Sequence, residues 1–151
     1  MMKALLVIDM QAGYIKKYPP ALLKRINARI EKAVSDKELI VYIKNTKTLR
    51  RGKYTNDFAT GLSICSELII CKEKADAFSN DELHKLLTQK QITTVELVGI
   101  DGNSCIAKTA ISAISYGYDT ILQSDCVGVQ NAERFITTKK MLSEKGVLIT
   151  D

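Results

Sequence analysis

The sequence opens with an apolar run, Lys3-Ala4-Leu5-Leu6-Val7-Ile8, that ends at Asp9. A run that is apolar at consecutive positions, and not only at alternate ones, is typical of a strand in a parallel sheet covered on both faces by helices. Packing gives no reason for a carboxylate at the end of such a strand. Because ligands of open α/β sheets bind beyond the carboxyl ends of the strands, Asp9 is a candidate functional residue. A turn or N-cap aspartate is the alternative.

The rest of the chain alternates between helix and strand patterns. Residues 21–33 have apolar positions at helical spacing and follow Pro19 and Pro20, which suit a helix start. We predict further strands at 39–43, 68–71, 94–99, 119–123 and 146–150, helices at 80–89, 104–117 and 131–144, and a long basic connection over 44–63. This order predicts one domain, residues 1–151, with a three-layer αβα Rossmann-like fold. Its six-stranded, mostly parallel sheet should carry helices on both faces.

Cys105 lies where a predicted buried strand turns through small residues into the helix 104–117. A helix N-terminus favours a thiolate and offers unpaired N–H groups to an oxyanion. Free cysteine is also among the most buried residue types, so a structural cysteine is the alternative.

A third predicted strand, 68–71, is followed by Lys72 and Lys74. A lysine brought close to Asp9 and Cys105 would stabilise a thiolate while the carboxylate moves protons. Chemistry alone does not separate the two lysines, and an ordinary solvated lysine is the alternative for each.

Three motifs resemble those of the isochorismatase-like cysteine hydrolases, which include nicotinamidases, N-carbamoyl amidases and ureido-compound hydrolases. The family's apolar strand with D-x-Q appears as Val7 to Gln11, and its G-x-x-x-x-x-C-[VI]-x-x-T-A motif appears as Gly99 to Ala110. Its K-x-x-x-S-A-F motif is similar to Lys72 to Phe78, with Asp76 in place of the serine. The spacing of that motif selects Lys72 over Lys74.

The resemblance implies a catalytic triad of Asp9, Lys72 and Cys105. It also implies a cis peptide at Ile100–Asp101 and an oxyanion hole formed by the backbone N–H groups of Asp101 and Cys105. The function it implies is hydrolysis of a small amide, carbamoyl or ureido C–N bond through a cysteine thioester. The alternative is a small-metabolite binding protein on the same fold that does not turn over its ligand.

Four positions are candidates for substrate binding: Gln11, Tyr14, Phe78 and Asn103. Tyr14 lies where the family pattern D-x-Q-N-D-F has its aromatic residue, so a tyrosine hydroxyl is expected over the pocket. Arg50, Arg51 or Lys53 of the basic connection are expected to reach the pocket if the substrate is an anion.

The sequence favours neither a metal nor another cofactor. Nicotinamidases carry an aspartate and histidines after their second strand, where this chain has Asn45-Thr46-Lys47. The single histidine, His84, lies in a predicted helix and is expected on the surface. Metal sites need several N, S or carboxylate ligands, so we expect a metal-independent enzyme. Isochorismatase itself is not favoured, since those members generally lack the cysteine.

A net charge of +5 raises the question of nucleic-acid binding, but the sequence contains no RNA-binding or helix-turn-helix pattern. The expected partners are a small-molecule substrate and further copies of the chain in a homo-oligomer, with no nucleic acid and no membrane. The cysteines at 65, 71, 105 and 126 show no C-x-x-C spacing, and no signal peptide is apparent, so a cytoplasmic protein with reduced thiols is expected. Cys71 is expected to point into the sheet and Cys126 to fill space.

Overall fold

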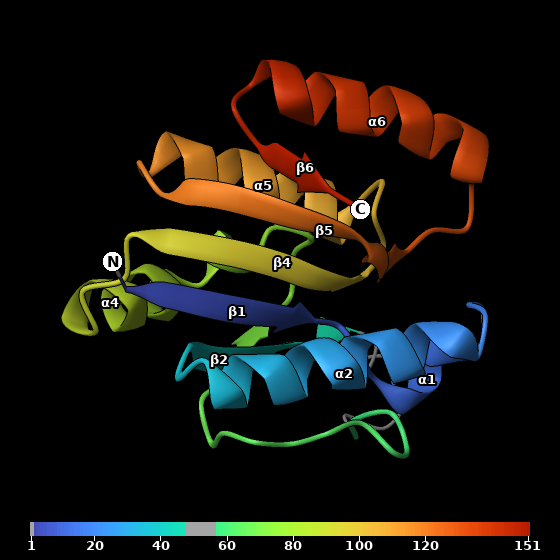
Figure 1. The fold of residues 1–151 in the computed structure, drawn as a ribbon, viewed down its shortest axis with the longest axis horizontal. Coiled ribbons are helices and arrows are strands. Elements are labelled where there is room, and N and C mark those ends of the chain that lie inside the picture. The colour runs from blue at the N-terminus through green and yellow to red at the C-terminus, as the bar shows by residue number, and fades with distance from the viewer. Residues whose placement is uncertain (1, 48–56) are drawn as a thin grey trace.

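A computed structural model of the protein describes residues 2–47 and 57–151, which form one parallel α/β sheet with its helices (Figure 1). The sheet has the strand order β3-β2-β1-β4-β5-β6, and every pairing in it is parallel. The predicted six-stranded α/β fold is therefore confirmed. The strands are β1 (Lys3–Ile8), β2 (Leu39–Asn45), β3 (Ile69–Lys72), β4 (Thr94–Ile100), β5 (Asp119–Gly128) and β6 (Leu148–Thr150). The helices are α1 (Ala12–Ile15), α2 (Ala21–Ser35), η1 (Ala77–Ser79), α4 (Asp81–Gln89), α5 (Cys105–Ser115) and α6 (Ala132–Glu144).

Each face of the sheet has its own hydrophobic core. Helix α2 covers one face through Leu22, Ile26 and Ile30, and α4, α5 and α6 contribute to the core of the other (Figure 1). The central strand β1 lies between these cores, and its residues from Ala4 to Ile8 are almost completely buried. This position explains why its sequence is apolar at consecutive positions. Among the described residues, no helix is long and apolar enough to span a membrane.

Several element ends differ from those predicted. Strand β5 continues to Gly128, well beyond residue 123, because its register against β4 shifts between Leu97 and Gly99 and pairing then resumes. Strand β3 includes Lys72, so this lysine is the last residue of the strand and not the first residue after it. Helices α1 and η1 were not predicted, since each is too short to show a periodic apolar pattern.

A charged network lies inside the fold at the amino ends of the strands. Glu96 on β4 has a side chain that is 4% exposed, and it binds Arg29 at 2.6 Å and Lys3 at 2.8 Å. Arg29 also binds Glu38 at 2.7 Å. Burial raises the pKa of Glu96, but the hydrogen bonds from Arg29 and Lys3 outweigh burial and hold it below its ordinary value. The network therefore stabilises the fold while Glu96 is ionised.

The variant Glu96→Gln should lower the free energy of unfolding at neutral pH by about 1.5–3 kcal/mol, because Arg29 and Lys3 lose the carboxylate that they share while Arg29 keeps its pair with Glu38. The loss should shrink as the pH falls through the lowered pKa of Glu96, where the wild-type side chain also becomes neutral. Urea unfolding of both proteins across this acid range measures the difference. The matched control is Asp36→Asn, which removes the exposed pair with Lys32 and should have little effect. A pH-independent difference would contradict the assignment.

Candidate functional site

Three segments from separate parts of the chain meet at the carboxyl edge of the sheet. Asp9 follows β1, Lys72 ends β3, and Cys105 begins α5 after the turn that follows β4. Parallel pairing brings these ends to one edge. The structure thus places the predicted residues Asp9, Lys72 and Cys105 next to one another.

Lys72 links the other two side chains. Its side chain is fully buried, and Nζ donates to Asp9 Oδ2 at 3.1 Å and to Cys105 Sγ at 3.5 Å. The backbone carbonyl of Ala75 accepts a third hydrogen bond at 3.1 Å. An ammonium with three donors is fully satisfied by these partners and is held in one position. Lys74, the alternative to Lys72 as the lysine near Asp9 and Cys105, is exposed.

Asp9 adopts a left-handed backbone conformation with φ of 56°, which aspartate tolerates better than most residues. Its backbone N–H continues the sheet by donating to the carbonyl of Ile43 at 3.0 Å. Burial raises the pKa of the Asp9 carboxyl above its ordinary value. The positive charge of Lys72 and the contacts with the Cys105 and Lys72 side chains lower this pKa, but by less than burial raises it. Oδ1 is buried and accepts no hydrogen bond from the described residues. This oxygen is available to take a proton.

The Cys105 thiol differs from expectation in its protonation. Its position at a helix start predicted a thiolate, yet burial and the negative charge of Asp9 raise its pKa to about 11, with Lys72 opposing them. A raised pKa favours the thiol over the thiolate, so a base close to the sulfur is needed to take its proton. The sequence could not show this, because the shift depends on burial and on the short separation from Asp9.

The turn before Cys105 contains a cis peptide at Ile100–Asp101, where the resemblance implied one. The Asp101 carboxylate holds this turn in place: it accepts hydrogen bonds from Tyr18 Oη at 3.0 Å and from the backbone N–H groups of Asn103 and Gln130.

The start of α5 has backbone N–H groups available to a ligand. Ser104, the N-cap of α5, makes no capping bond through its side chain. Within the described residues, the backbone N–H groups of Asp101 and Cys105 donate to no backbone acceptor.

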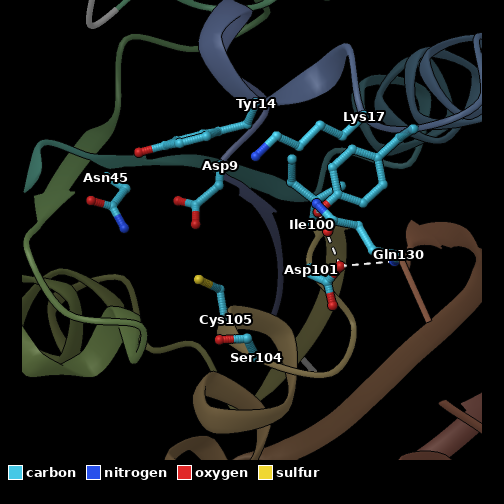
Figure 2. A pocket seen from close by; sticks show the side chains of 10 residues that line it. Asp9, Tyr14, Lys17, Asn45, Ile100, Asp101, Ser104, Cys105 and Gln130 are labelled. Carbon is cyan, nitrogen blue, oxygen red and sulfur yellow. Dashed lines mark hydrogen bonds between the residues drawn. The ribbon is translucent and has the colours of Figure 1, made fainter. Parts of the chain in front are cut away.

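A cavity of about 190 Å³ opens above the thiol. Figure 2 shows the Asp9 carboxylate and the Cys105 sulfur close to each other, with the Tyr14 ring above them and the Lys17 ammonium directed toward Asp9. Its lining residues come from four segments of the chain: Asp9, Tyr14, Lys17, Tyr18, Asn45, Ile100, Asp101, Ser104, Cys105 and Gln130. The space suits a small molecule that reaches the sulfur.

Of the four residues predicted to bind substrate, only Tyr14 is among the described residues that line the cavity above Cys105. Tyr14 lines the cavity, while Asn103 lines a neighbouring cavity of about 440 Å³ and is held there by Thr138 and Asn131. Gln11 is 1% exposed and bonds both ways to the backbone of Asn45, so it fastens the end of β1 to β2. Phe78 is 3% exposed and packs in the core against Tyr116 and Tyr118. Neither Gln11 nor Phe78 is among the described residues that line the cavity.

Several lining residues were not predicted. Asn45 is the last residue of β2, and Gln130 lies just beyond the end of β5. Because ligands bind beyond the carboxyl ends of parallel strands, their positions in the sequence, like that of Asp9, were a signal that could have identified them. Lys17 and Tyr18 follow the short α1, whose sequence has no periodic signal. Arg50, Arg51 and Lys53, the cations expected near the pocket, lie outside the described residues.

Asp76, which replaces the family serine, has a structural role. Its Oδ1 accepts from the backbone N–H of Phe78 at 2.9 Å and so caps η1, and its Oδ2 accepts from the Ser112 hydroxyl. A serine hydroxyl is able to make the same cap. The substitution therefore preserves the turn whose Ala75 carbonyl holds Lys72.

The remaining cysteines and the histidine lie away from the cavity. Cys126 is buried beneath α2 with Sγ 3.6 Å from the carbonyl of Arg25, as a space-filling residue should be. The prediction for Cys71 was wrong: it is exposed, because β3 is an edge strand and this side of it is uncovered. His84 is half-buried and not fully on the surface, since its ring stacks on Tyr116 at 4.3 Å.

The cavity does not suit a metal site made of an aspartate and histidines. Its carboxylates are Asp9, which is paired with Lys72, and Asp101, whose oxygens already accept hydrogen bonds. Over residues 2–47 and 57–151, no group of three or more His, Cys, Asp or Glu side chains is placed to hold a metal ion. The described residues therefore do not fit a site of that kind.

Comparisons with known proteins agree with this architecture. Residues 3–151 match the family model of the isochorismatase domain. The isochorismatase family protein YaaI of Bacillus subtilis is 27% identical over 87% of this chain and 83% of its own length. Maleamate amidohydrolase of Pseudomonas putida is 24% identical over 86% of this chain and 74% of its own. The crystal structure of pyrazinamidase of Pyrococcus horikoshii in complex with zinc superimposes with a TM-score of 0.87 at 21% identity, covering 100% of this chain and 99% of the other.

Proposed function

The chain belongs to the isochorismatase family, and from that premise we propose that it hydrolyses a small amide, carbamoyl or ureido C–N bond through a thioester on Cys105. One observation carries the proposal. A buried ammonium, Lys72 Nζ, contacts both a carboxylate and a thiol at the floor of a cavity. The names of two relatives, a maleamate amidohydrolase and a pyrazinamidase, denote amide hydrolysis and support the choice of bond.

In the first half of the reaction, Cys105 Sγ attacks the substrate carbonyl carbon while Asp9 takes the thiol proton. Oδ1 receives it, because Oδ2 is engaged by Lys72. The backbone N–H groups of Asp101 and Cys105 stabilise the negative charge on the carbonyl oxygen. When the tetrahedral intermediate collapses, the C–N bond breaks and Asp9 returns its proton to the departing nitrogen.

In the second half, a water molecule attacks the thioester. Asp9 takes a proton from this water, the C–S bond breaks, and the sulfur leaves as a thiolate that recovers the proton from Asp9. Lys72 stabilises both anions of the cycle, the Asp9 carboxylate and the departing thiolate. The acid product then leaves through the cavity.

Ammonia release from nicotinamide, an N-carbamoyl amino acid, a ureido acid and maleamate tests the proposal. At least one compound should release ammonia, and acid quenching during turnover should trap an acyl group on Cys105 that mass spectrometry locates. The exposed Cys65 and Cys71 serve as internal controls and should carry no acyl group. Tight binding without ammonia release or adduct would favour the binding protein that does not turn over its ligand.

The dependence of activity on pH should show whether Lys72 or Lys74 acts on the Asp9 carboxylate. Asp9 has to be ionised to accept the thiol proton, and Lys72 lowers the pKa that burial raises. The variant Lys72→Met should therefore reduce activity and move the acid limb of kcat/KM to higher pH. Lys74→Met is the matched control, because Lys74 is exposed two residues away, and it should keep the wild-type profile. An unmoved limb in Lys72→Met would show that this charge does not act on the base.

A further inference from the structure

Lys17 is a cation of the cavity that the described residues leave without an anionic partner. It follows α1, lines the same cavity as Asp9 and Cys105, and directs its ammonium into the space above Asp9 (Figure 2). Within residues 2–47 and 57–151, no carboxylate forms an ion pair with it. A charge placed in this way is available to a ligand.

The carboxylates of the cavity are already engaged. Asp9 is bound by the Lys72 ammonium at 3.1 Å. Asp101 accepts from the Tyr18 hydroxyl at 3.0 Å, from the Asn103 N–H at 2.8 Å and from the Gln130 N–H at 3.1 Å. Neither carboxylate forms an ion pair with Lys17, so a ligand carboxylate is free to do so.

The neighbouring cavity adds further positive charge. It shares Tyr18, Asp101, Ser104 and Gln130 with the cavity above Cys105, and Lys108 and Arg134 also line it. Asp101 is the acidic side chain among its described lining residues. A cleft lined mainly by one sign of charge raises the local concentration of ligands of the opposite sign.

We propose that the substrate carries a carboxylate in addition to its scissile C–N bond, and that Lys17 binds this carboxylate. This inference rests on the proposed function and narrows it to anionic substrates. The scissile carbonyl lies over Cys105, and the carboxylate extends toward the mouth of the cavity, where a charge-assisted hydrogen bond to Lys17 orients it. Tyr14, on the same short segment, covers the body of the molecule (Figure 2).

Binding of a matched pair of compounds tests the inference without turnover. Maleamate and maleamide share one carbon skeleton and differ in whether a carboxylate or a second amide ends it. The Cys105→Ala protein should bind maleamate about tenfold more tightly than maleamide in titration calorimetry, the gain expected from one charge-assisted hydrogen bond to the exposed Lys17 ammonium. Adding Lys17→Met should bring the two affinities together. Adding Lys16→Met, which alters an exposed neighbour, should leave the ratio unchanged.

The outcomes separate this inference from the proposed function. Equal affinities of Cys105→Ala for the two compounds overturn the inference. A tenfold ratio that is kept after Lys17→Met also overturns it. So does a ratio that is lost in Lys108→Met, because the carboxylate would then bind the lysine of the neighbouring cavity. Hydrolysis by the wild-type protein without preference for maleamate also overturns it and leaves the hydrolase intact. A preference that depends on Lys17, without hydrolysis of any amide, supports the anion site and contradicts the hydrolase. Lys17→Gln repeats the test should Lys17→Met alter the melting temperature.

Discussion

Replacing Cys105 with alanine should lower kcat for amide hydrolysis by at least about 10⁴-fold, because removing the nucleophile of a covalent mechanism leaves only binding and oxyanion stabilisation. The thiol lines the cavity, and Cys65, Cys71 and Cys126 are not among its described lining residues. Ammonia release under single-turnover conditions measures the loss, and no acyl adduct should accumulate.

Cys71→Ala is the matched control, since it removes an exposed thiol from a strand of the same sheet. It should retain wild-type kcat. The melting temperatures of both variants should stay near that of the wild-type protein, because Cys105 is only partly buried. Activity of Cys105→Ala within tenfold of wild type would mean that water attacks the substrate directly and that no thioester forms.

Replacing Gly99 with alanine should cause the largest loss of stability among single-methyl additions near the site. Gly99 has φ of 121°, and a Cβ there would lie 2.1 Å from the carbonyl oxygen of Ile8. These residues are register partners on β1 and β4, so the methyl group would push the two central strands apart. Left-handed backbone and overpacking together should cost about 3–5 kcal/mol.

Thermal unfolding measures this cost, and for a domain of this size the melting temperature should fall by roughly 10 °C. Gly117→Ala is the control, because Gly117 has φ of 91° but nothing within 4 Å of an added Cβ. It isolates the backbone contribution and should cost only about 1 kcal/mol. Equal losses in the two variants would show that the contact with Ile8 relaxes at little cost. Activity of folded Gly99→Ala should also fall, since Asp9 directly follows Ile8.

The sheet, Asp9 and Cys105 could be predicted because they follow from strand patterns. Those patterns left Lys72 and Lys74 open, and the resemblance to the family's lysine motif selected Lys72. Apolar runs mark the buried strands, and Asp9, Lys72 and Cys105 each lie at a strand end or in the turn that follows one. The protonation of Cys105 could not be predicted, since it results from burial and from the charge of Asp9.

The cavity walls were predicted less well for a physical reason. Gln11 lies beside Asp9 in sequence, but its amide is held by the backbone of Asn45, and no pattern in the sequence reveals that bond. Phe78 lies within the lysine motif, yet its ring packs against tyrosines near the end of α5. Lys17 follows a four-residue helix that has no buried residue, so no periodicity distinguishes it from other surface lysines.

The shortness of α1 has a consequence for how substrate range evolves in such a protein. Helix α1 has no fully buried residue, whereas Cys105 begins a helix that is packed into the core. Under the proposed function, substitutions at Lys17, which is exposed and lines the cavity, should change what the cavity admits at little cost in stability, whereas Tyr14 and Ile15 pack against the core beneath α2. Directed evolution toward a new amide should therefore begin with a library at Lys17.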